Sequence, residues 1–102
     1  MFLALWEYEV KLGSEKEYEK VYGPEGDWAR LFRRDARYRG TRLLRDAEGQ
    51  RVYMTMDFWE TQVAYEEFLR KHKDEYEQIE RIGEGLTLKE KRVGWFESRS
   101  GD

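Results

Sequence analysis

Hydrophobic and polar positions alternate along residues 2–10, and residues 51–59 form a largely apolar run, so that each segment is predicted to be a β-strand. In the first strand the even positions are all apolar, whereas the odd positions include Glu7 and Glu9. The second strand differs because both of its faces are largely apolar. Val52, Met54, Met56 and Phe58 point to one side, and Tyr53, Thr55, Asp57 and Trp59 point to the other.

The remaining pattern predicts helices and two further strands. Ser14 and Glu17 have the spacing of a capping box, and Thr61 is a suitable N-cap for a second, longer helix. Gly23-Pro24 breaks the first helical region. The expected elements are helical segments at 14–22 and 28–32, a strand at 41–46, a hairpin loop at 47–50, a helix from 62 that bends near 72–74 and ends at Gly83 and Gly85, one helical turn at 87–90, and a strand at 92–97.

This order, β-α-β-β-α-β, predicts an α+β protein with the ferredoxin-like plan. One four-stranded antiparallel sheet would carry the helices on a single face, because right-handed crossovers place them together. The other face would then be bare, although the strand at 51–59 is apolar on both sides. Since an exposed apolar patch of that size marks an interface, we expect a homodimer that packs two sheets face to face.

Composition narrows the class of protein. The chain has 102 residues, which predicts one domain over residues 1–98 with a polar tail at 99–102. Charged residues make up 40%, yet the net charge is only −3, as expected for an ion-paired, solvated surface. Cys and Asn are absent, and few thermolabile residues combined with many charges predict a thermophilic source. No apolar run has the length of a membrane span, so a cytoplasmic protein without membrane contact is expected.

Four segments resemble the antibiotic biosynthesis monooxygenase-like family of dimeric α+β-barrel proteins: YGPEGDW at 22–28, LFRR at 31–34, TRLLRD at 41–46 and MDFWET at 56–61. The resemblance extends from about Leu3 to Glu97. It implies a homodimer, with a pocket in each subunit between the sheet and the helices. It also implies an activity from the group that includes cofactor-independent oxygenation of phenols, quinol oxidation and haem degradation.

Two departures from that family bear on the activity. The haem-degrading branch has a pattern of His, Asn and Trp, whereas this chain has a single His and no Asn. The cofactor-independent oxygenases hold their substrate with an Asn, among other polar groups, and that residue is missing too. The first departure argues against the haem-degrading branch, so no cofactor is expected, and a single imidazole argues against a metal site that needs two.

Asp57 is the candidate catalytic residue. A carboxylate in the middle of a strand is costly to bury, so it must have a hydrogen-bonding or charged partner or reach an opening to solvent. It could accept a phenolic proton in a pocket, or it could form an ion pair with an Arg or a contact at the start of the helix near Thr61. A set of aromatic residues could form the walls of a cavity for a flat ligand, or could simply fill the core. The set comprises Trp6, Tyr8, Tyr22, Trp28, Phe32, Tyr65 and Phe68.

The arginines between 30 and 51 and the single histidine can each be explained without a functional site. Eight Arg fall between Arg30 and Arg51, and they could bind an anion or RNA, or could pair with acidic residues of the long helix. The sequence pI of about 5.3 favours the second interpretation, so no nucleic-acid partner is expected. His72 lies among charged residues and is predicted to be a solvated helix residue rather than a base.

Three functions remain open from the sequence. The first is a cofactor-independent oxygenase or oxidase for an electron-rich aromatic substrate, with Asp57 as proton acceptor and Tyr8, Tyr22 or an Arg as donors. The second is a non-catalytic dimer that binds a small apolar ligand. The third is a structural dimer whose own aromatic side chains fill the cavity, which a volume below about 300 Å³ would favour.

Overall fold

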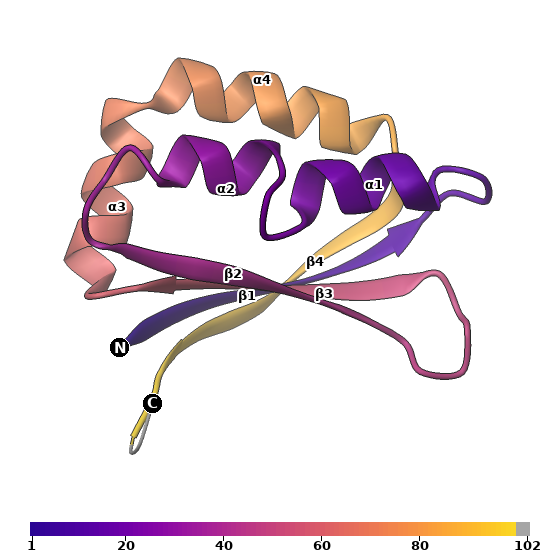
Figure 1. Cartoon of the computed structure of the whole chain (residues 1–102), viewed down its shortest axis with the longest axis horizontal. Helices are drawn as coiled ribbons and strands as arrows, with labels where there is room; N and C mark the ends of the chain where they lie inside the picture. The colour runs from indigo at the N-terminus through magenta and orange to yellow at the C-terminus, as the bar shows by residue number, and fades with distance from the viewer. Residues whose placement is uncertain (100–102) are drawn as a thin grey trace.

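The computed structural model describes residues 1–99 and confirms the predicted β-α-β-β-α-β plan, with each helical region divided in two. All the helices lie on one face of a single antiparallel sheet, as predicted (Figure 1). The predicted tail lies mostly at 100–102, outside the described residues. The elements are β1 (Phe2–Val10), α1 (Glu15–Tyr22), α2 (Asp27–Phe32), β2 (Tyr38–Arg45), β3 (Val52–Trp59), α3 (Gln62–Lys71), α4 (Lys73–Glu84) and β4 (Thr87–Glu97).

The strand order in the sheet is β2-β3-β1-β4, so that β1 and β3 occupy the centre and both hydrogen-bond on two sides. The register places Ala4 opposite Asp57 on β3, and Asp57 opposite Thr41 on β2. Residues that are directly opposite in an antiparallel pair share a face of the sheet. Ala4 is fully buried under the helices, and this row therefore directs Asp57 and Thr41 toward the helical layer.

Both predicted breaks in the helices are present. Between α1 and α2 the chain passes so close to the end of α1 that a Cβ at Gly26 would overlap the backbone carbonyl of Lys20, which only glycine avoids. Between α3 and α4, His72 has φ −113° and ψ 35°, outside helical geometry. Thr61 caps α3 as expected, because its Oγ1 accepts a hydrogen bond of 3.1 Å from the Ala64 amide.

Three local predictions were wrong. The helical turn expected at 87–90 is part of β4, which begins at Thr87 because β1 pairs with it as far as Val10. β2 begins at Tyr38 rather than at residue 41, because Tyr38 pairs with Trp59 across a bulge. Ser14 is at the N-cap of α1, but its side chain makes no capping hydrogen bond, so the capping box is not formed.

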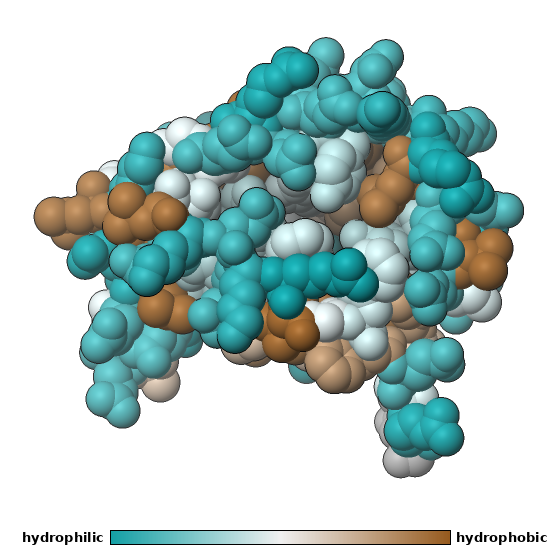
Figure 2. Space-filling view, turned by 180° about the vertical axis from the view of Figure 1, so that it is seen from behind, coloured by the Kyte–Doolittle hydropathy of each residue, from teal (hydrophilic) through white to brown (hydrophobic). Residues whose placement is uncertain are grey.

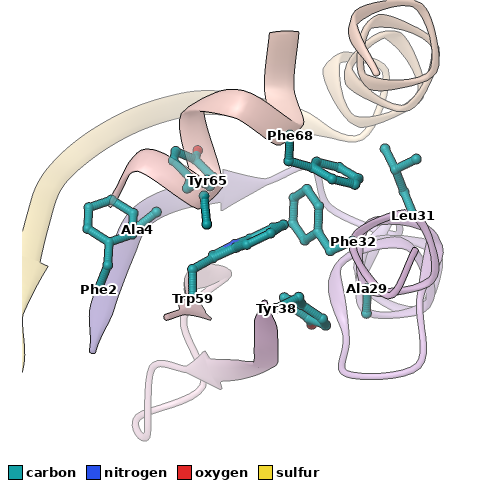
Figure 3. Packing of buried hydrophobic residues seen from close by; sticks show 10 residues of the cluster. Phe2, Ala4, Ala29, Leu31, Phe32, Tyr38, Trp59, Tyr65 and Phe68 are labelled. Atoms are coloured by element: carbon teal, nitrogen blue, oxygen red, sulfur yellow. The ribbon is translucent and has the colours of Figure 1, made fainter. Parts of the chain in front are cut away.

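The core consists largely of aromatic side chains in two adjoining clusters on the helical side of the sheet. In the first, Trp59 is fully buried and lies in the middle of a ring of aromatic neighbours (Figure 3). Its ring centroid lies 5.2 Å from that of Phe68 and 5.4 Å from that of Tyr38. The second cluster is rich in tyrosine, with the rings of Tyr18 and Tyr22 stacked at 4.3 Å.

The opposite face of the sheet has no helix over it within residues 1–99 (Figure 1). Leu44 and Phe96 are each 47% exposed there, and the β3 residues Met54, Met56 and Phe58 are half-buried. Hydrophilic side chains cover most of the helical layer, whereas brown side chains also gather along the lower edge, on the sheet side (Figure 2). Each helix in residues 1–99 is too short or too polar to span a bilayer.

Candidate functional site

A pocket lies between the sheet and the helices, where the two aromatic clusters meet. Its walls come from every element except β2. Six of the seven aromatic residues proposed from the sequence line it. The lining consists of Trp6, Tyr8, Tyr22, Trp28, Phe32, Thr55, Asp57, Tyr65, Tyr76, Glu80 and Glu90. The remaining one, Phe68, lies outside the pocket and packs in the first cluster, where its ring faces Phe32 at 5.7 Å.

The cavity is small in this structure. Its volume is about 30 Å³, enough for about two water molecules, whereas sites for small molecules usually occupy about 300 Å³ or more. The rings themselves fill the space: Tyr8 lies 4.8 Å from Tyr22, and Trp28 lies 4.8 Å from Tyr76, between ring centroids. A flat ligand can therefore enter only if some of these rings move outward.

Asp57 is a carboxylate of the sheet at the floor of this pocket. Protein atoms surround its carboxyl group, although part of the residue's surface opens into the cavity. Thr41 donates a hydrogen bond of 2.6 Å from its Oγ1 to Asp57 Oδ1. Burial raises the pKa of Asp57 to about 6, and the hydrogen bond from Thr41 opposes part of that rise.

Neither partner suggested for Asp57 by the sequence is present. No Arg or Lys among residues 1–99 forms an ion pair with it, and the Thr61 side chain is occupied in capping α3. A buried carboxylate without a cation is costly to keep ionised. Such a group can accept a proton at a pH close to neutral, which is the property required of a general base.

Two further carboxylates line the pocket and were missed from the sequence. Glu90 lies on β4 directly opposite Tyr8, and Glu80 lies on α4. Burial raises the pKa of Glu90, and repulsion from Glu80 and Glu84 adds to the effect. Glu90 could have been found by extending the last strand back to Thr87, because the register with β1 then brings it beside Tyr8.

Several donors surround the same space. Burial raises the pKa of Tyr22 to about 12 and also raises the pKa of Tyr8, so both phenols keep their protons. The indole Nε1 of Trp28 is buried and has no hydrogen-bond partner among the described residues. An unpaired buried donor of this kind is available to a polar atom of a ligand. The pocket therefore combines hydrogen-bond donors with a carboxylate acceptor.

Gly83 on α4 makes room for one wall of the pocket. A Cβ at this position would overlap the Tyr22 hydroxyl and would lie 3.0 Å from Tyr22 Cζ. Sequence reasoning placed Gly83 at the end of the helix, whereas α4 continues to Glu84 and Gly83 is buried inside it. The glycine is thus needed for the close approach of Tyr22 rather than for termination of the helix.

The basic residues lie away from the pocket. Arg34 pairs with Glu75 at 2.7 Å, Arg37 pairs with Glu67 at 2.8 Å, and Arg39 pairs with Glu60. Arg30 and Arg33 contact Asp27 and Glu25. This pairing supports the interpretation that these arginines form ion pairs at the surface rather than a binding site for an anion. His72 lies at the junction of α3 and α4, where its ring packs on Phe68 at 4.3 Å between centroids.

At the level of sequence, no protein-family model and no curated protein matches the chain. Solved structures do match. SnoaB, a cofactor-independent oxygenase from Streptomyces nogalater, is 19% identical, and the match covers 98% of this chain and 94% of SnoaB with a TM-score of 0.77. A mutant of SnoaB has a TM-score of 0.81 with the same identity and coverage.

Two further structures extend the comparison. A candidate antibiotic biosynthesis monooxygenase from Nitrosomonas europaea is 10% identical over 96% of this chain and 98% of its own, with a TM-score of 0.73. An uncharacterised NIPSNAP domain protein from Burkholderia xenovorans is 14% identical over 98% and 96%, with a TM-score of 0.69. The chain has the fold of the antibiotic biosynthesis monooxygenase-like proteins. The resemblance found in the sequence is thereby confirmed at the level of the fold.

This monooxygenase-like fold is shared over almost the whole length of each chain. At an identity of 19% or less, similarity of the fold does not mean that the side chains lining the pocket are shared. A fold hosts many activities, and the activity has to be argued from the groups in the site.

Proposed function

We propose that this protein is a cofactor-independent oxidase or monooxygenase that acts on a small, electron-rich phenol or quinol, with Asp57 as the proton acceptor. The observation that carries the proposal is a carboxylate at the floor of an aromatic pocket, with no cation beside it among residues 1–99 and a pKa of about 6. The monooxygenase-like fold supports the same class of reaction, and SnoaB provides an oxygenase with this architecture.

The chemistry assigned to the protein is limited to proton transfer and orientation. A phenol that gives its proton to Asp57 becomes a phenolate, which transfers electrons to dioxygen far more readily than the neutral phenol. For a quinol, loss of two electrons and two protons to dioxygen gives the quinone and hydrogen peroxide. The tyrosine hydroxyls and the Trp28 indole would orient the substrate and donate to the developing anion.

The charges in the pocket indicate which phenols are suitable. Asp57, Glu80 and Glu90 line it, and no Lys or Arg among the described residues does. A substrate that carries its own carboxylate or phosphate would be repelled. A neutral phenol or quinol therefore fits best, and the arginine considered from the sequence as an anion donor is not part of the proposal.

A second candidate function is supported by the volume of the cavity. About 30 Å³ is far below the size of a usual ligand site, which favours a structural dimer whose aromatic residues fill their own pocket. The oxidase proposal requires the pocket to widen when substrate binds, by rotation of rings such as Tyr76 at its edge. Binding of a ligand without turnover would indicate the remaining alternative, a non-catalytic binding protein.

We also propose that the protein is a homodimer whose subunits pack through the bare face of the sheet. The apolar residues on that face support this assembly, because two such faces in contact would remove them from water. Sedimentation at micromolar concentration provides the test. A stable monomer would contradict the proposal.

Oxygen uptake with a panel of neutral hydroquinones tests the activity. We expect uptake, with formation of hydrogen peroxide and quinone, by the wild type and a loss of at least about 100-fold in Asp57→Asn. Asp74→Asn is the matched control, because it removes the same charge from an exposed position on α4 and should react like the wild type.

The pH dependence gives a second readout. Only the ionised carboxylate accepts a proton, so kcat/KM should rise with pH and level off above the pKa of about 6. Titration of tryptophan fluorescence with the same compounds separates the alternatives. Saturable binding without oxygen uptake would favour the binding protein, and neither binding nor uptake would favour the structural dimer.

A further inference from the structure

The Asp57 carboxylate is one end of a chain of hydroxyl groups that runs to the edge of the sheet. Thr41 Oγ1 lies 2.6 Å from Asp57 Oδ1, and the Tyr38 hydroxyl lies 2.5 Å from Thr41 Oγ1. Thr41 and Asp57 are directly opposite each other in the β2–β3 pair, so the sheet itself fixes the first contact. Tyr38 comes from the start of the same edge strand.

The direction of both hydrogen bonds follows from the ionised state of Asp57. A carboxylate can only accept, so the one hydrogen of the Thr41 hydroxyl must point to Asp57. Thr41 can then only accept from Tyr38, whose phenol must be the donor. The chain is therefore polarised in one sense, from Tyr38 through Thr41 to Asp57, and each bond strengthens the next.

The packing of Tyr38 fixes the position of its hydroxyl group. Tyr38 is 9% exposed, and its ring packs between Phe32 at 5.5 Å and Trp59 at 5.4 Å, measured between ring centroids. Its hydroxyl position is therefore set by the rigid first aromatic cluster rather than by solvent. No hydrogen bond from residues 1–99 reaches the second oxygen of Asp57, Oδ2, which stays available to a substrate.

We propose that Thr41 and Tyr38 are positioning residues, which hold Asp57 as an ionised base in a single orientation with Oδ2 left for the substrate proton. This role rests on the proposed function of Asp57. It assigns to the edge strand β2, which contributes nothing to the wall of the pocket, the task of orienting the group that does the chemistry.

Among residues 1–99, no other group near Asp57 donates a hydrogen bond to its carboxyl group. From β1, α1, α3 and α4 the facing groups are phenols of high pKa, and α4 and β4 add two carboxylates; together they are Tyr8, Tyr18, Tyr22, Tyr65, Tyr76, Glu80 and Glu90. Burial disfavours ionisation of Asp57. The hydrogen bond from Thr41 is the contact that favours it.

Titration of the Asp57 carboxyl carbon by NMR, in the protein without substrate, tests the inference. The signal is identified by its absence from Asp57→Asn. We expect Thr41→Val to raise the pKa of Asp57 by about one unit, because a hydrogen bond to the charged form is lost. Thr41→Ser should titrate like the wild type, and Tyr38→Phe should give a smaller rise in the same direction.

Thr55→Val is the matched control for the titration. Thr55 lies on the same strand and the same face as Asp57 and is 3% exposed, but it makes no hydrogen bond to that carboxyl group. Its substitution should leave the Asp57 pKa in place. Valine is favourable in strands, so both variants should fold, and Tyr38→Phe leaves the strand backbone unchanged.

The outcomes are separable from those of the activity experiment. A Thr41→Val shift no larger than that of Thr55→Val would overturn the positioning role, whether or not the protein oxidises quinols. A shift as expected, with no turnover in the wild type, would refute the oxidase function and leave the hydrogen-bond chain intact. With turnover present, the acidic limb of the kcat/KM profile should move with the NMR pKa, which a purely structural role would not produce.

Discussion

The two faces of β3 show how differently one strand can be used. Toward the helices, Tyr53 and Trp59 are at most 1% exposed and are locked among other rings. Toward the other side, Met54 and Met56 are half-buried with no helix over them in residues 1–99. Rigid rings fill the covered face, whereas flexible methionines lie beside Phe58 on the bare one, where their side chains can adapt to a partner such as the proposed second subunit.

The covered face also carries the group that is most expensive to bury. Asp57 stands between Thr55 and Trp59 in the same row, and it has one hydrogen bond and no cation among the described residues. Natural proteins break a packing rule of this kind mainly where function requires it. The covered face thus holds both the packed aromatic core and the proposed base Asp57. The bare face is expected to serve assembly.

The largest expected effect comes from adjacent residues on opposite faces. Trp59→Ala should cost about 3–5 kcal/mol of unfolding free energy, because a fully buried ring is lost from the first cluster. Phe58→Ala should cost clearly less in a monomer but weaken the dimer. Urea denaturation and sedimentation equilibrium measure the two effects. Equal losses of stability, with unchanged association for Phe58→Ala, would contradict the division between the faces.

A smaller effect of opposite sign is expected at Asp57. Its pKa is raised from 3.8 to about 6 in the folded protein, so the folded state holds the proton more tightly than the unfolded state. Stability is therefore greatest below the lower value and falls as pH rises through the higher one. Asp57→Asn should stabilise the protein by about 2–3 kcal/mol near pH 8, and by almost nothing near pH 4.

Urea denaturation of wild type and Asp57→Asn at both pH values measures this difference. The same variant should lose the proposed activity, which would place stability and function in opposition at one residue. A variant that is less stable than the wild type near pH 8 would mean that Asp57 has a favourable partner in the folded protein, and the account of an uncompensated carboxylate would be wrong.

The smallest effect tests how tightly the covered face is packed around the pocket. Gly83→Ala should destabilise the protein by about 1–2 kcal/mol, because overlap with Tyr22 outweighs the gain in helix propensity. In a Tyr22→Phe background the cost should largely disappear, since the overlapping hydroxyl is gone. A double-mutant cycle by thermal or urea denaturation measures the coupling. Additive costs would show that Tyr22 does not depend on Gly83.

Much of the fold could be predicted because the relevant signals are local. Alternation placed Trp59 and Asp57 on one face and Phe58 on the other. Gly23-Pro24 and the bend expected near 72–74 marked the two helix breaks. The turn expected at 87–90 failed because a capping-box spacing competes with long-range pairing, and here the ladder with β1 dominates.

The candidate site was predictable only in part. Six of the seven aromatic residues named from the sequence line the pocket, whereas Phe68 packs in the first cluster. Tyr76 and Glu80 were missed as pocket residues because α4 is placed by the bend at His72, whose angle no sequence pattern specifies. The contact of Gly83 with Tyr22 joins two helices far apart in the chain, and it depends on the same angle.

The order of the elements, the two faces of each central strand and the position of Asp57 in the middle of a strand could be read from the amino-acid pattern. These features follow from periodicity, which is a property of neighbouring residues. The hydrogen bonds that join Asp57 through Thr41 to Tyr38, and the small volume of the pocket, become visible in the folded chain alone. Register between strands and the distance between layers set those features, and both emerge only when the whole chain packs.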